Sequence, residues 1–210
     1  MEFVFVVPRG DLFPDCYPHG LVPFGEEYSL ESFERAVVEY GFFVERPRAE
    51  VEPAWKQVIP YTALVRGDDV FLVRRLSQGG EVRLHDKLSI GIGGHINPVD
   101  LPQDGARNPI AAATQRELEE ELEIEGTWTS TPLGILNDDT NPVGAVHVGF
   151  VQVVHLTGDA SVRETDQLEG DWTSLEELVR LAESDTNFET WSSLLLPHLS
   201  ANLPDPIPTA

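Results

Sequence analysis

The clearest chemical signal in this chain is a short run of five glutamates, Glu117, Glu119, Glu120, Glu121 and Glu123. In a helix of about 3.6 residues per turn, Glu117, Glu120 and Glu121 fall within an arc of about 100°. Like charges four residues apart each cost a helix about 0.2–0.5 kcal/mol, so the cluster indicates a countercharge. A hard divalent cation such as Mg²⁺ prefers oxygen ligands and would provide it. The alternative is a solvated acidic helix face.

The segment before this run carries a strong helix-start signal. Asn108 is a favourable N-cap residue, and Pro109 is favourable at the first helical position. An apolar side is supplied by Ile110, Ala113, Leu118 and Leu122. The sequence therefore predicts an amphipathic helix over residues 109–123, which would hold the glutamates rigidly.

The segment from Arg116 to Ile124 resembles the second half of the Nudix box, Arg-Glu-U-x-Glu-Glu-x-Gly-U, in which U is a bulky aliphatic residue. Every defined position matches except Glu123, which stands where the pattern has glycine. Because three acids, one arginine and two aliphatics keep fixed spacing, this half of the resemblance is fairly specific. We expect Gly126 to provide the turn that the missing glycine would otherwise make.

The first half of the box departs further from the pattern. Gly94 matches the opening glycine, but the stretch from Gly94 to Arg116 is longer than the pattern allows. We place the extra residues in the loop Asn97–Arg107, and Asn108 then stands where the pattern has its first glutamate. The run Gly93-Gly94-His95 is similar to a Gly-Gly-His subset of the superfamily known as predicted phosphoesterases.

The resemblance implies an α/β (α+β) fold, with a Nudix-type mixed β-sheet sandwiched between helices over residues 54–199. Residues 1–53 lie outside it and are interpreted as an N-terminal α/β extension packed on the core. Three roles remain open for the extension: it extends the sheet, covers the substrate or forms a homodimer contact. Residues 200–210 are interpreted as a flexible tail.

The resemblance also implies a hydrolase that cleaves a pyrophosphate bond in a nucleoside diphosphate linked to another moiety. Mg²⁺ or Mn²⁺ would be bound by Glu117, Glu120, Glu121 and the Gly94 carbonyl, and Arg116 would orient a carboxylate of the box. Such ions neutralise phosphate charge, lower the pKa of bound water and align it for attack. A catalytically weak Nudix-like module that binds a ligand or regulates is the alternative.

The general base is expected among acids that reach the attacking water. Glu120 or Glu121 is one source. Glu164, in a loop after the last long predicted strand, is another, with a plain surface acid as its alternative. Asp138 and Asp139 are weaker candidates because they lie in a turn-like stretch.

Substrate binding is assigned to basic residues that precede the box. Arg74, Arg75 and Arg83 belong to the main positive region of the chain, which also includes Arg66, Lys87, His85 and His95. Guanidinium groups bind phosphate through paired hydrogen bonds. Alternatively, these arginines only decorate a hairpin. His95 is interpreted either as a phosphate or metal-shell contact or as a loop residue that pins the backbone.

The composition agrees with an enzyme of one domain. The chain has 210 residues, of which 41% are hydrophobic, and a net charge of −22. That charge would repel nucleic-acid backbones and anionic membranes, so a small nucleotide or phosphate ester is the expected partner. No apolar run approaches the about 20 residues that cross a bilayer. The single cysteine, Cys16, and the lack of a basic leader indicate a cytoplasmic protein.

Periodicity and turn residues predict the elements that would position these groups. A β-hairpin is expected from Gln57–Arg66 and Val70–Arg75. The other expected strands are Phe3–Val7, Phe42–Glu45, Leu88–Ile92, Thr127–Leu136 and Val146–Leu156. Further helices are expected over Leu30–Tyr40, where Gly41 is the stop, from about Leu175 after a Thr173 or Ser174 cap, and over Asn187–Leu199.

Overall fold

The computed structural model describes residues 1–15, 17–76, 87–102, 108–163, 165–166, 168–184 and 187–202, without the side chains of 200–202. The α-helices of these residues are α1 (Arg9–Leu12), α2 (Leu30–Tyr40), α3 (Arg46–Ala49), α4 (Ile110–Glu121), α5 (Leu175–Glu183) and α6 (Thr190–Asn202). Two short 3₁₀ turns are η2 (Pro98–Asp100) and η3 (Gly144–Val146).

The strands alternate with these helices along the chain. They are β1 (Phe3–Pro8), β2 (Gly20–Pro23), β3 (Phe42–Glu45), β4 (Trp55–Arg66), β5 (Asp69–Arg75), β6 (Leu88–Ser89), β7 (Ile92–Gly93), β8 (Leu122–Ile124), β9 (Trp128–Asn137), β10 (His147–Leu156), β11 (Ala160–Val162) and β12 (Leu168–Ser174). A ten-stranded sheet has the order β12-β5-β4-β10-β9-β2, with β1, β3, β6 and β7 paired off this path, and β8 pairs with β11 in a second sheet. The predicted α/β class is confirmed.

Backbone contacts divide the chain into two compact units. The first contains residues 1–61, 93–117 and 132–152, and the second contains residues 62–92, 118–131 and 153–210. The boundary falls inside α4, after Glu117, so this one helix contributes residues to both units.

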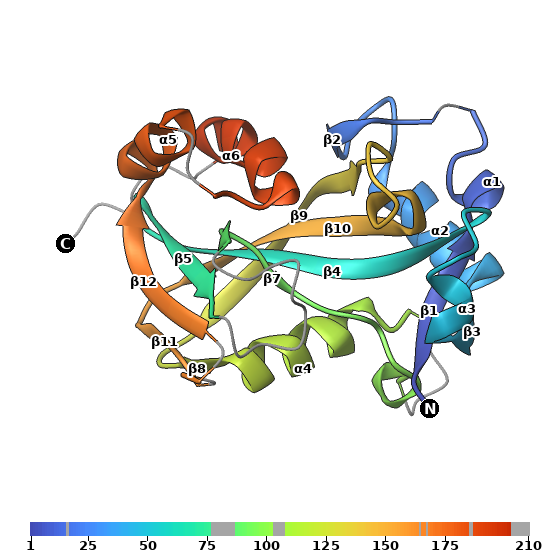
Figure 1. Cartoon of the computed structure of the whole chain (residues 1–210), viewed down its shortest axis with the longest axis horizontal. Helices are drawn as coiled ribbons and strands as arrows, with labels where there is room; N and C mark the ends of the chain where they lie inside the picture. The colour runs from blue at the N-terminus through green and yellow to red at the C-terminus, as the bar shows by residue number, and fades with distance from the viewer. Residues whose placement is uncertain are drawn as a thin grey trace. The chain divides into compact units, whose positions relative to one another are not determined.

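The first unit is built on the N-terminal strand. β1 pairs antiparallel with β3 and also with β4, where Val6 is opposite Gln57. Figure 1 shows β1, β3 and α3 side by side. The N-terminal segment therefore extends the sheet, which was one of the three roles left open for it. The core of this unit includes Phe5, Leu12, Phe33, Val37, Val58, Ile96, Ile110, Ala113, Ile135, Val148 and Phe150.

Gly41 follows the last residue of α2 in a closely packed position. Its φ is −71°, which any residue adopts, so no left-handed turn requires glycine there. A Cβ at this position would lie 2.0 Å from the Phe5 ring. The predicted stop at Gly41 is confirmed, and a side chain at this position has no room because β1 lies close to the end of α2.

The second unit is built on β5 and β12, which pair antiparallel from Asp69↔Ser174 to Arg75↔Leu168. Gly67, with a φ of 59°, makes the tight turn between β4 and β5. The Ser174 side chain accepts a hydrogen bond from the Glu177 amide, so the predicted cap of α5 is confirmed at Ser174. Helices α5 and α6 lie against each other in Figure 1.

One predicted strand of the second unit is interrupted. Residues 88–92 were expected to form a single strand, but β6 ends at Ser89 and β7 begins at Ile92. The Ser89 hydroxyl accepts from the Gly91 amide and donates to the Gly91 carbonyl. These local hydrogen bonds compete with the strand ladder and therefore break it.

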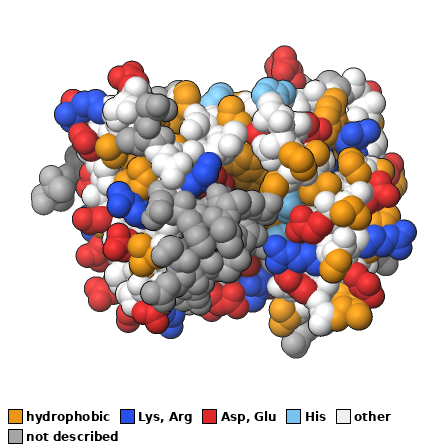
Figure 2. Space-filling view, in the orientation of Figure 1, with side chains coloured by type: hydrophobic (Ala, Val, Ile, Leu, Met, Phe, Trp, Pro, Cys, Tyr) orange, Lys and Arg blue, Asp and Glu red, His pale blue; other side chains and the backbone are white. Residues whose placement is uncertain are grey.

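Acidic side chains are spread over the visible surface in Figure 2 and are not gathered in one patch. This distribution agrees with the net charge of −22. Among the described residues, no helix is both long and apolar enough to cross a membrane.

A buried lysine anchors the segment that precedes β10. Lys56 is fully buried, and its Nζ donates to the Asp139 carboxylate at 2.6 Å and to the Gly144 carbonyl at 2.9 Å. Burial lowers the pKa of Lys56, although Asp139 opposes this effect. Burial tends to raise the pKa of Asp139, but hydrogen bonds from Lys56 and Tyr17 outweigh it and hold the pKa below its ordinary value.

We predict that Asp139→Asn destabilises the fold, because it leaves the Lys56 ammonium buried without its countercharge. The expected loss at neutral pH is about 2–4 kcal/mol in urea unfolding. Because the pKa of Asp139 is depressed by folding, its contribution is full above the ordinary value of 3.8 and is lost as pH falls through the folded value. The difference between variant and wild type should therefore shrink in acid. Glu176→Gln, in an exposed pair with Arg180, is the control and should cost under about 0.5 kcal/mol.

Candidate active site

The helix that carries the acidic run begins as predicted and ends earlier. The Asn108 side chain accepts a hydrogen bond from the Ile110 amide at 3.1 Å, so Asn108 caps α4 where the Nudix box has glutamate. The predicted helix over residues 109–123 was too long, since α4 ends at Glu121 and Glu123 pairs with Ser161 between β8 and β11. Gly126 has a φ of 91° and makes the turn that follows.

Arg116 is the best-connected side chain of the site. Its Nε and Nη2 donate to the two carboxylate oxygens of Asp100 at 2.8 and 2.9 Å. Its Nη1 donates to Glu117 at 2.7 Å, and Nη2 also donates to the His95 carbonyl at 2.8 Å. The hydrogen bonds to Asp100 raise the pKa of Arg116 far above its ordinary value, against the opposing effect of burial. Arg116 is therefore a permanent cation that fixes Glu117.

Asp100 is a site residue that the sequence analysis missed. It is 3% exposed and lies in η2, where its carboxylate also accepts from the Asn97 amide at 2.7 Å. The Asn97-Pro98 start followed by an acid three residues after Asn97 is a helix-start signal that could have drawn attention to it. The first part of the supposed loop insertion thus supplies the anion that holds Arg116.

Gly94 lies directly against Glu117. A Cβ on Gly94 would come within 2.4 Å of the Glu117 carboxylate carbon and of one of its oxygens. The Glu117 side chain is 13% exposed. Glycine at position 94 therefore permits a close approach between this carboxylate and the backbone.

Glu121, on the part of α4 that belongs to the second unit, is 3.7 Å from Arg75 Nη2 and is 14% exposed. Arg74 and Arg75 are neighbours on β5, and successive side chains of a strand point to opposite faces. The structure therefore brings Arg75 to a glutamate of the box, while Arg74 is exposed on the other face. Glu120 is exposed on α4.

His95 contributes through both its backbone and its ring. Its carbonyl accepts from Arg116, and its Nε2 is 3.2 Å from Nε2 of His147. His147 begins β10, and the sequence analysis did not identify it. Three other residues considered there, Cys16, Arg83 and Glu164, lie outside the described residues.

We predict that Gly94→Ala destabilises the first unit. The new methyl group meets the Glu117 carboxylate, which cannot move away without loosening its hydrogen bond from Arg116. We expect a loss of about 1–3 kcal/mol in urea unfolding. The control is Gly10→Ala in α1, where a Cβ would meet no atom within 4 Å. Equal stability of the two variants would contradict the close contact.

Comparisons with known proteins show which proteins the chain is similar to. No protein-family model matches the sequence. The chain is 37% identical over 199 residues to protein YmaB of Bacillus subtilis, covering 93% of this chain and 96% of YmaB. The crystal structure of Tm1382, a protein assigned to the Nudix hydrolases, is similar with a TM-score of 0.78 and 28% identity over 96% of this chain and 100% of Tm1382.

Two more distant structures share the fold. DR0079 of Deinococcus radiodurans has a TM-score of 0.54 at 19% identity, over 79% of this chain and 94% of DR0079. The Nudix domain of Shewanella oneidensis NrtR, solved with ADP-ribose, has a TM-score of 0.53 at 13% identity, over 71% of this chain and 89% of that domain. The box residues on α4 and the similarity to Tm1382 show that the chain belongs to the Nudix hydrolase superfamily.

Proposed function

We propose that the protein is a Mg²⁺- or Mn²⁺-dependent pyrophosphohydrolase that acts on a nucleoside diphosphate linked to another moiety. The observation that carries the proposal is the position of Glu117, which is held by Arg116 on one side and lies against Gly94 on the other. A surface helix that is acidic only for solubility has no need of a buried acid, Asp100, that fixes its arginine.

The donor groups fit a hard divalent cation. Glu117, Glu120 and Glu121 occur with helical spacing on α4, and Glu117 and Glu121 are only 13% and 14% exposed. Their carboxylates offer only oxygen atoms, which Mg²⁺ and Mn²⁺ prefer, and the Gly94 carbonyl is the further oxygen ligand that the resemblance to the box implies. Such a cation, when bound, neutralises phosphate oxygens and lowers the pKa of a coordinated water.

The side chains of the protein then have separate tasks. Arg116 positions Glu117 and does not need to touch the substrate. Glu120 is exposed, so its carboxylate can reach a water molecule without any rearrangement of buried side chains. We therefore assign Glu120 as the general base. Arg75, 28% exposed beside Glu121, is suited to bind a phosphate oxygen.

The substrate class follows from charge and from the fold. A chain with a net charge of −22 repels an anionic substrate unless cations and arginines offset the field locally. ADP-ribose, held by the NrtR domain, is a nucleoside diphosphate linked to a sugar, and this fold therefore accommodates the class. We choose ADP-ribose as the first probe, followed by nucleotide sugars, dinucleotides, nucleoside triphosphates and CoA esters.

We predict that Glu120→Gln lowers the turnover number for the best substrate of this panel by about 10²–10⁴-fold, because it removes a proton acceptor and a metal ligand. The matched control is Glu119→Gln, which removes the same charge from an exposed neighbour on α4 and should retain parental turnover. Product release is measured with Mg²⁺ and with Mn²⁺.

Parental turnover in Glu120→Gln would refute the assigned site. If wild-type protein binds ADP-ribose or another member of the panel but releases no product from any of them, the chain is a ligand-binding module and not a hydrolase. Unchanged melting temperatures in both variants show that the fold is intact.

We further predict that Mn²⁺ raises the melting temperature of the wild type, because a ligand that binds only the folded state stabilises it by about 2.7 kcal/mol at 100 times its Kd. The double variant Glu117→Gln with Glu121→Gln should lose this rise. Glu119→Gln with Glu123→Gln removes equal charge from exposed positions and should keep it. If both double variants lose the increase in melting temperature, Mn²⁺ is responding to the total negative charge of the segment and not to a specific site.

A further inference from the structure

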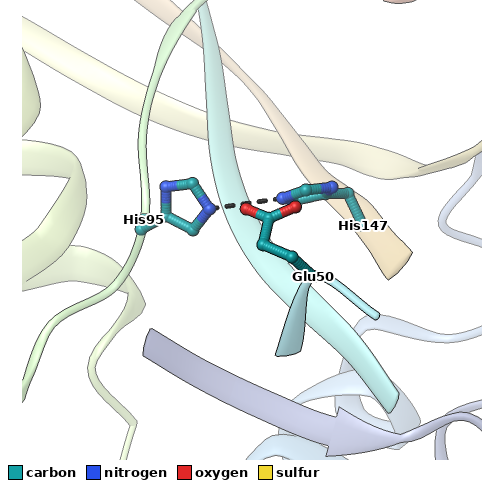
Figure 3. A group of neighbouring side chains, drawn as sticks. All are labelled: Glu50, His95 and His147. Atoms are coloured by element: carbon teal, nitrogen blue, oxygen red, sulfur yellow. Dashed lines mark hydrogen bonds between the residues drawn. The ribbon is translucent and has the colours of Figure 1, made fainter. Parts of the chain in front are cut away.

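We propose that Glu50, His95 and His147 form a second metal site, separate from the box carboxylates, for a transition-metal cation of the Zn²⁺ class. Glu50 directly follows α3, His95 follows β7, and His147 begins β10. Their potential ligand atoms all lie within 4.8 Å of one another. Figure 3 shows the Glu50 carboxylate pointing toward both imidazole rings.

The distance between the two imidazole nitrogens fits shared coordination. Nε2 of His95 and Nε2 of His147 are 3.2 Å apart. At zinc–nitrogen distances of about 2.0–2.1 Å, that separation corresponds to an angle of about 100° at the metal, near the tetrahedral value. Without a metal, one proton between the two nitrogens holds the rings together. A cation would replace this proton without a large movement of either ring.

His147 is already oriented as a ligand. Its Nδ1 lies 2.7 Å from the Val143 carbonyl, which can only accept, so Nδ1 carries the proton in the neutral ring. The lone pair is then on Nε2, which faces His95. Metal-bound histidines commonly donate their other N–H to a carbonyl in this way. His147 is also 5% exposed, so packing restrains its rotamer.

Glu50 is held from its other side. Arg46 Nε donates to Glu50 Oε1 at 3.3 Å, and Nη1 of Arg46 also donates to Glu2 at 3.0 Å. The two carboxylates outweigh the single guanidinium, so this group carries a net negative charge that attracts a cation. A hydrogen bond to a ligating carboxylate is the usual outer-shell arrangement.

The donor set selects the class of cation. Two imidazole nitrogens and one carboxylate oxygen suit Zn²⁺ and neighbouring transition metals, whereas Mg²⁺ requires oxygen ligands. Two histidines and one glutamate leave a fourth coordination position open, as in catalytic zinc sites. Water or a substrate oxygen would occupy that position.

The site has a consequence for the N-terminal segment. Glu50 belongs to residues 1–53, whereas His95 immediately follows Gly94, and the His95 carbonyl is bound by Arg116. A bound cation would therefore connect the N-terminal segment to the backbone that supports Glu117. This role goes beyond the proposed hydrolysis and does not require it.

We test the proposal by titrating metal-free protein with Zn²⁺ by calorimetry and with Co²⁺ by visible absorption. Wild type should bind one Zn²⁺ that His147→Ala and His95→Ala lose. Loss of an outer-shell partner weakens metal binding by about 10–100-fold, and Glu50→Gln, which removes a ligand, should weaken Zn²⁺ binding by at least as much. The matched control is His155→Ala on the same strand, β10, which should bind as the wild type does.

The same titration in the Glu117→Gln, Glu121→Gln double variant separates the two sites. Zn²⁺ binding that survives in this variant and is lost in His147→Ala supports the second site, even if no hydrolase activity is found. Binding that is lost in the double variant and kept in His147→Ala and His95→Ala overturns the proposal. His95→Ala and Glu50→Gln alter partly exposed residues and keep the test valid if His147→Ala does not fold.

Discussion

The candidate site depends on one ion pair, between the guanidinium of Arg116 and the carboxylate of Asp100. Asp100 is almost fully buried, and it accepts two hydrogen bonds from Arg116 in the paired geometry that gives such contacts their strength. With its orientation fixed in this way, Arg116 holds Glu117 and the His95 carbonyl in place. Removing Asp100 would leave a half-buried cation with a single carboxylate, and the position of Glu117 would no longer be determined.

This arrangement explains how an acidic helix remains stable close to many like charges. Arg116 compensates Glu117, and Arg75 compensates Glu121, so the two least exposed acids of α4 each have a guanidinium nearby. Glu119, Glu120 and Glu123 are exposed, where water screens their repulsion. The net negative charge of α4 would attract a divalent cation.

The sequence predicted several elements well because their periodicity is strong. The bounds of α2, β1, β3, β5 and β10 all lie within one residue of those expected. It did not predict β12, whose exposed residues Glu169, Gly170 and Asp171 carry no apolar pattern, and which is a strand because it pairs with β5. Asp100 and His147 were missed for a related reason. The helix-start signal at Asn97 marks the turn that contains Asp100, but it does not indicate which residue Asp100 binds. The partners of Asp100 and His147 are distant in sequence, so neither contact can be read from the local pattern.

His95 connects the two sets of functional groups inside the first unit. Its backbone carbonyl is fixed by Arg116, and its ring meets His147 beside Glu50. The carbonyl and the ring of His95 are therefore each restrained by a hydrogen bond. The Gly-Gly-His run therefore has two physical requirements. The glycine at position 94 lets Glu117 approach the backbone, and the histidine at position 95 places its ring beside His147 and Glu50, where a bound cation would join that backbone to the N-terminal segment.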